Sequence, residues 1–173
     1  VTFKLDGGTY QGETKDVVYN DVYKGEGLRS EHKVPVPTKE GYEFKGFTGF
    51  DAATKYTADT SYTASWAIQS YKVSYKLTGD VPEGVTAPTV KDAVVFNTKT
   101  NVLDKLTAPG YNFSGWTTDD ATINNGSFNM PAKNVTFTGS FTAKEKVKVT
   151  FKLDGGTYQG ETKDVVYNDV YKG

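Results

Sequence analysis

Apolar and polar residues alternate in several short segments of this chain. In residues 1–5, Val1, Phe3 and Leu5 are separated by Thr2 and Lys4, and residues 73–77 and 135–141 alternate in the same way. A period of two is typical of a strand with one buried face and one face in water. The pattern therefore predicts short strands that share small cores.

Turn-forming residues lie between these segments. Asp6-Gly7-Gly8 tolerates positive φ and predicts a hairpin or bulge after the first strand, so residues 16–19 can return as its partner. Pro35 and Pro37 make the next segment extended and exclude it from the centre of a sheet. Residues 100–106 form the one segment with a helical pattern. The pattern predicts a mainly β fold, with at most a small α+β character.

The chain closes on the sequence with which it opens. Residues 149–173 repeat residues 1–25 letter for letter, at an offset of 148 residues. An identity of this length indicates a tandem array, of which the chain holds one full unit and the start of the next. Arrays of near-identical modules serve reach or multivalency more often than catalysis.

The second copy makes a structural prediction of its own. Val149, Phe151 and Leu153 leave an apolar strand face uncovered and a sheet edge unpaired. We expect residues 149–173 to be ordered by pairing within the chain or with a neighbouring molecule. In the second case they can replace residues 1–25 of another copy by strand exchange. The alternative is that they complete a domain that begins after residue 25.

A fainter repeat lies inside the unit. Three short segments recur in the same order. Residues 1–5 resemble residues 73–77, residues 41–47 (GYEFKGF) resemble residues 110–116 (GYNFSGW), and residues 62–66 resemble residues 137–141, and we call these segments the three landmarks.

This inner repeat predicts two related modules, residues 1–67 and 70–143, with residues 149–173 as the start of the next unit. The linkers at 67–70 and 142–146 are not rich in Gly, Ser or Pro, so neither is expected to be a free swivel.

Composition limits the classes of function. With 20 basic and 21 acidic residues the net charge is −1, so no basic patch is expected to bind nucleic acid or an anionic membrane. The absence of cysteine excludes disulfides, thiolate zinc sites and cysteine nucleophiles. No apolar run approaches the ~20 residues that span a bilayer, and these 173 residues themselves contain no signal-peptide or anchoring pattern. We expect neither nucleic acid nor membrane as a partner.

The aromatic residues of the two Gly-Tyr motifs have two interpretations. They can form a carbohydrate-stacking platform, or they can form the cores of small sheets, which alternation and flanking glycines favour. Gly46 and Gly115 then mark a bulge or a close packing contact. The residues in question are Tyr42, Phe44, Phe47, Tyr111, Phe113 and Trp116.

No constellation of catalytic residues stands out. His32 lies in a polar segment beside the prolines without a serine placed to pair with it, so we expect a solvated loop histidine. Asp51 and Asp119-Asp120 lack the spacing of a calcium loop and are expected to cap turns. We therefore predict no catalytic residues, no metal ligands and no cofactor, and we assign no ligand-binding residues. The sequence leaves a Lys–Asn isopeptide crosslink open.

Both modules resemble known repeat families. VTFKLDGGTY, GYEFKGF and YTASW in the first module resemble the internalin-type B-repeat, also called the Listeria–Bacteroides repeat, although Phe47 stands where Trp is usual. In the second module YKLTGDVPEGVTAP, GYNFSGWTTDD and GSFNMPAKNVTFTGSF resemble the streptococcal high-identity tandem-repeat (SHIRT) type. These resemblances imply two tandem β-grasp-like modules in a surface protein of a bacterium, often Gram-positive, without enzymatic activity.

Two hypotheses for function follow. The first is a stalk attached to the cell wall, in which beads in an elongated row lift an adhesive domain outward. The second is adhesion, in which one module binds a host glycan, mucin or matrix protein weakly and repetition supplies avidity. The expected partners are neighbouring units of the same protein and, for adhesion, that host molecule. We do not expect an enzyme.

Overall fold

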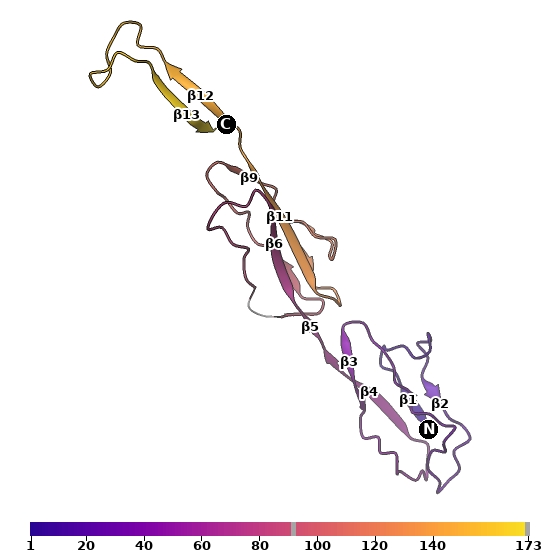
Figure 1. Cartoon of the computed structure of the whole chain (residues 1–173). Helices are drawn as coiled ribbons and strands as arrows, with labels where there is room; N and C mark the ends of the chain where they lie inside the picture. The colour runs from indigo at the N-terminus through magenta and orange to yellow at the C-terminus, as the bar shows by residue number, and fades with distance from the viewer. Residues whose placement is uncertain (91–92, 172–173) are drawn as a thin grey trace. The chain divides into compact units, whose positions relative to one another are not determined.

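The computed structural model describes residues 1–90 and 93–171 (Figure 1). The chain divides into two compact units, and each combines distant segments of the sequence. Unit 1 consists of Val1–Val73, Asp92–Thr100 and Asp120–Val135, and unit 2 of Ser74–Lys91, Asn101–Asp119 and Thr136–Gly173. The module boundaries at 67–70 and 142–149 stay a prediction.

The main sheet of unit 1 has the strand order β2-β1-β4-β3. Its strands are β1 (Thr2–Lys4), β2 (Val17–Val18), β3 (Tyr42–Phe47) and β4 (Ser61–Ile68). β2 and β1 are antiparallel, as the Asp6-Gly7-Gly8 turn predicts, and β1 and β4 are parallel. β3 is antiparallel to β4, with a bulge between Phe44 and Phe47. Because β1 supplies the central strand beside β4, residues 1–25 complete this sheet.

The core of unit 1 is built around Phe3, which is 0% exposed. Its ring centroid lies 4.8 Å from that of Phe47, 5.4 Å from that of Phe50 and 5.7 Å from that of Tyr62. Such aromatic pairs stabilise a fold beyond the area they bury. Pro35 and Pro37 are fully buried and lie outside every strand, which confirms that they are excluded from the centre of the sheet.

Two small strand pairs complete the secondary structure assigned mainly to unit 1. β5 (Ser70–Tyr71) is antiparallel to β7 (Val94–Val95). β8 (Lys99–Asn101) is hydrogen-bonded to β10 (Ser127–Asn129).

Unit 2 contains a sheet with the order β6-β11-β9. The strands are β6 (Val73–Gly79), β11 (Val135–Ala143) and β9 (Tyr111–Phe113), and the terminal residues Val73 and Val135 belong to unit 1. In both sheets the third landmark of the inner repeat is the middle strand (β4 and β11), between the first landmark (β1 and β6) and the second (β3 and β9). The inner repeat of the sequence therefore corresponds to the same strand order in both sheets.

Aromatic rings also form the core of unit 2. The Tyr75 ring centroid lies 4.8 Å from that of Trp116 and 5.1 Å from that of Phe137. Phe113 packs on Trp116 at 4.9 Å and on Phe141 at 4.7 Å.

The helix predicted at residues 100–106 is wrong. β8 covers the start of this segment, and the following backbone groups bind core side chains. The Leu103 amide donates to the Tyr75 hydroxyl (3.2 Å), and the Asp104 carbonyl accepts from the Trp116 indole (3.0 Å). Two turns of helix are too short to outweigh such contacts.

The mainly β class is confirmed, whereas the β-grasp assignment stays a prediction. Residues 1–90 and 93–171 contain no helix of the length and hydropathy needed to cross a membrane.

The second copy of the repeated segment forms a hairpin with itself. β12 (Lys146–Phe151) is antiparallel to β13 (Val165–Tyr171), so residues 149–171 are ordered within their own chain (Figure 1). Phe151 is 59% exposed, whereas the identical Phe3 is 0% exposed. Of the predicted apolar face, Phe151 is uncovered, whereas Val149 and Leu153 are half-buried. Strand exchange between chains stays a prediction.

Candidate functional site

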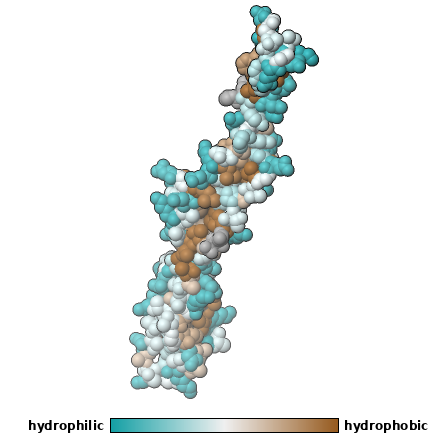
Figure 2. Space-filling model, turned by 90° about the vertical axis from the view of Figure 1, so that its left-hand side faces the viewer, coloured by the Kyte–Doolittle hydropathy of each residue, from teal (hydrophilic) through white to brown (hydrophobic). Residues whose placement is uncertain are grey.

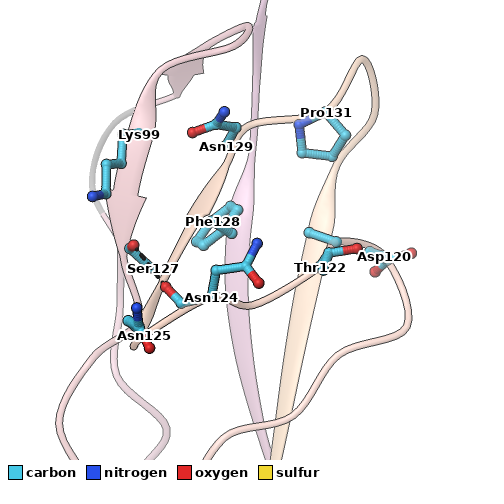
Figure 3. A pocket seen from close by; sticks show the side chains of 10 residues that line it. Lys99, Asp120, Thr122, Asn124, Asn125, Ser127, Phe128, Asn129 and Pro131 are labelled. Carbon is cyan, nitrogen blue, oxygen red and sulfur yellow. Dashed lines mark hydrogen bonds between the residues drawn. The ribbon is translucent and has the colours of Figure 1, made fainter.

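An open groove of about 670 Å³ lies in unit 1 along residues 120–131 and β8. Its lining includes the amide side chains of Asn124, Asn125 and Asn129 and the side chain of Lys99 (Figure 3). Phe128 lies in its floor but is only 3% exposed, so its ring has no free face for stacking.

A tight turn positions one end of the groove. Asn125 (φ 50°) and Gly126 (φ 72°) both have positive φ, the combination that Asn-Gly adopts in a two-residue hairpin turn. Asn124 and Ser127 exchange both backbone hydrogen bonds across it, and the Ser127 hydroxyl also donates to the Asn124 carbonyl (3.0 Å; Figure 3). The turn therefore fixes the backbone from which Asn124 and Asn125 project.

The chemistry of this groove is hydrogen bonding. Its charged groups are Lys99 and Asp120, and Asp120 is paired with Lys133 at 3.1 Å. Amides and hydroxyls on an open surface can bind a polar ligand such as a glycan, but they do not supply an activated nucleophile with a base.

The aromatic residues of the Gly-Tyr motifs lie mostly in the cores. Phe47 and Trp116 are each 7% exposed, which confirms the core interpretation for them, and the other four are half-buried. Gly46 lies in the bulge of β3, as predicted, and a Cβ on Gly115 would lie 3.3 Å from Lys105 Cε, a close packing contact.

The exposed large aromatic side chains described belong instead to the two copies of the repeated segment: Tyr23, Phe151, Tyr158, Tyr167 and Tyr171. On the face seen in Figure 2, apolar areas are bordered by polar residues.

The prediction of a solvated His32 is wrong, because its side chain is buried. Its Nδ1 accepts from the Arg29 amide (3.2 Å), and its Nε2 lies 2.9 Å from Asp21 Oδ1. Arg29 also pairs with Asp21 (2.6 Å) and with Glu31 (2.7 Å). These contacts draw the polar segment onto the Tyr19 ring, which lies 4.8 Å from the imidazole. The neighbouring Ser30 donates its hydroxyl to Glu31. The histidine thus anchors a loop.

Because of the ion pairs around Asp21, we expect the stability of unit 1 to fall at acid pH. Desolvation acts to raise the pKa of Asp21, but the hydrogen bond with His32 and the charge of Arg29 outweigh it and hold that pKa below its usual range. A lowered pKa stabilises the fold above the unfolded-state value of about 4, and this contribution is lost as pH falls through the folded-state pKa. We expect Asp21→Asn to reduce the loss of melting temperature between about pH 5 and about pH 2.

The matched control is Asp169→Asn, the same position in the second copy, where an exposed carboxylate pairs with Lys146 at 3.1 Å. An Asp21→Asn profile that follows the wild type would contradict the role of this carboxylate.

The aspartates considered as calcium ligands do not lie together in one site. Asp51 Oδ1 accepts from the Ala53 amide (2.9 Å), which confirms its role in capping a turn. Among the described residues, no group of three His, Asp or Glu side chains is arranged to hold a metal ion.

Sequence reasoning missed the groove. Its signal was the run Asn124-Asn125-Gly126 with Asn129 close behind, which predicts a turn but not that β8 comes to lie beside it.

Family models match both parts of the chain. Residues 1–68 match the Listeria-Bacteroides repeat domain, which supports the resemblance of the first module to this repeat. Residues 84–145 match the divergent InlB B-repeat domain, while the SHIRT resemblance of the second module stays a prediction. No curated protein and no solved structure matches the chain.

Proposed function

We propose that this chain, which carries repeat domains of the Listeria–Bacteroides type, is a repeat unit of a bacterial cell-surface protein and acts as a non-enzymatic stalk. Repeats of this type occur in extracellular surface proteins. The stalk would project an adhesive domain from a cell wall. The observation that carries the proposal is the letter-for-letter return of residues 1–25 at 149–173, since adding such units changes reach without any new contact.

The side-chain chemistry supports this proposal. The one histidine of the chain is engaged in the ion-pair cluster with Asp21 and Arg29. The polar groups of the groove beside β8 are amides, hydroxyls, Lys99 and the Asp120 carboxylate, which pairs with Lys133. Neither arrangement has the nucleophile, base and orienting acid that an enzyme site would need.

The groove favours one alternative function. Asn124, Asn125 and Asn129 bring three exposed amides to one groove, which suits weak binding of a glycan. Repetition of such a site along an array would convert weak binding into avidity.

Proteins of one, two and three units distinguish the two functions. A stalk is expected to lengthen by about 60 Å per unit in small-angle scattering, if each module of about 70 residues adds about 30 Å. It should show no retention on panels of glycans and matrix proteins. A maximum dimension that stays constant would contradict the stalk.

Adhesion predicts retention that rises steeply with unit number and is lost in Asn124→Ala/Asn129→Ala. Asn20→Ala, at an exposed position outside the groove, is the control and should keep it.

A further inference from the structure

The first glycine of each Gly-Tyr motif lies under an aromatic ring from a segment later in the chain. In unit 1, a Cβ on Gly41 would lie 2.1 Å from Cδ1 of Phe96, and in unit 2 a Cβ on Gly110 would lie 2.4 Å from Cζ of Tyr171. Both glycines also have positive φ, +75° and +80°. The two rings therefore occupy space that the side chain of any other residue would need.

The same backbone hydrogen bond accompanies both contacts. The Gln69 amide donates to the Gly41 carbonyl at 2.8 Å, and the Lys144 amide donates to the Gly110 carbonyl at 2.8 Å. The two glycines are equivalent in the inner repeat, and the two donors both follow the middle strand of a sheet. One arrangement thus occurs twice in the chain.

Residues that follow these donors enter the next strand pair. Ser70 lies opposite Val95, next to Phe96, and Lys146 lies opposite Tyr171 itself. The Lys146 ammonium also lies 5.5 Å from the centre of the Tyr171 ring. Both segments that the sequence marks as linkers are therefore largely ordered by strand pairing. In each case the ring that covers the preceding glycine lies at the end of the paired strand or next to it.

The repeated segment shows what this arrangement changes, because one sequence occurs in two settings. Tyr23 and Tyr171 occupy the same position of the repeat. In residues 17–23 of the first copy the strand covers Val17–Val18 alone, and Tyr23 is 63% exposed. In the second copy the strand runs over Val165–Tyr171 and its last ring covers Gly110. The second copy differs in having residues 144–148 before it.

We propose that the first glycine of each Gly-Tyr motif is a docking position for an aromatic ring of the following module. Tyr23 is then the ring that the Gly110 position of a preceding unit receives, so the partner of this surface is a second copy of the unit in the same array. The inference concerns joints between modules, and it holds for a stalk and for an adhesin alike.

A double-mutant cycle tests the joint in the full chain. Gly41→Ala combines backbone strain with a clash, whereas Gly49→Ala has the same strain (φ +71°) with no atom within 4 Å of the new Cβ. We expect Gly41→Ala to raise the unfolding equilibrium constant about tenfold more than Gly49→Ala. In a Phe96→Ala background the two substitutions should act equally. Equal effects in the wild-type background would overturn the proposal.

A second measurement needs no glycine variant. The Phe96 ring should shift the Hα resonances of Gly41 upfield, and Phe96→Leu should remove this shift while keeping an apolar side chain. Hα resonances that stay in place in Phe96→Leu would overturn the joint even if Gly41→Ala fails to fold.

Hydrogen exchange tests the joint at Gly110 with an internal control. Residues 169–171 and 21–23 have the same sequence and therefore the same intrinsic exchange rates. Because a lone hairpin is marginal in water, we expect at least about tenfold slower exchange at 169–171 only if Tyr171 is docked. Gly110→Ala should remove this difference, and Gly84→Ala (φ +77°, open space) should keep it. Equal exchange of the two segments in the wild type would overturn the proposal.

Discussion

Replacing Phe3 by Ala is expected to lower the free energy of unfolding of unit 1 by about 3–5 kcal/mol, the usual loss for a fully buried phenylalanine. The ring is 0% exposed and touches the rings of Phe47, Phe50 and Tyr62, which belong to segments far apart in the sequence. Urea unfolding followed by the fluorescence of Trp66, in a Trp116→Phe background, measures the change.

Phe151→Ala is the matched control, because the same residue occurs there in the same sequence. Its ring is 59% exposed and has one aromatic neighbour, Tyr167, at 6.1 Å. We expect a loss of no more than about 1.5 kcal/mol. Equal losses for the two substitutions would show that the Phe3 core does not limit the stability of unit 1.

Gly139→Ala is expected to destabilise unit 2 by about 1–3 kcal/mol through overpacking. A Cβ at this position would lie 2.2 Å from Phe113 Cζ and 2.8 Å from Trp116 Cε3. The φ of Gly139 is outside the left-handed region, so steric contact alone causes the loss. Urea unfolding followed by NMR signals of β11 measures the effect.

Unit 1 shows how the clash can be relieved. There the equivalent positions hold Phe47 and Ala64, which lie opposite each other in the sheet. We expect Trp116→Phe to restore part of the stability of Gly139→Ala, because this pair recreates the arrangement of unit 1, with a coupling of about 0.5–3 kcal/mol. A Gly139→Ala protein as stable as the wild type, or losses that simply add, would contradict this account.

The aromatic pattern predicted which rings form the cores, but not which neighbouring positions must be small to make room for those rings. Trp66 and Trp116 are at different positions of the inner repeat, and each ring packs on a glycine so closely that no side chain fits there. A Cβ at Gly8 would lie 2.5 Å from Trp66, and a Cβ at Gly139 would lie 2.8 Å from Trp116. The equivalent positions in the other module are Asp80 and Ala64. These differences between the two modules are visible in the sequence. Only the packing shows that each tryptophan is accompanied by a glycine that makes room for it.

Three errors share a cause. His32 lies in a polar segment, residues 100–106 have a helical pattern, and the groove residues form an ordinary turn. Each outcome depended on a partner distant in the chain: Asp21 for the histidine, Tyr75 and Trp116 for the backbone of 103–104, and β8 for the groove. Local propensity cannot include such contacts, and tertiary packing outweighs it when they form.

The sequence by itself determined the tandem repeat, the short alternating strands with their turns, and the landmarks that become equivalent strands in two sheets, because all of these depend on spacing along the chain. Only the tertiary structure decided that residues 165–171 form a longer strand than the identical residues 17–23. The physical reason is that a strand needs a partner: residues 146–147 supply one to the end of the second copy, where Tyr171 also covers Gly110.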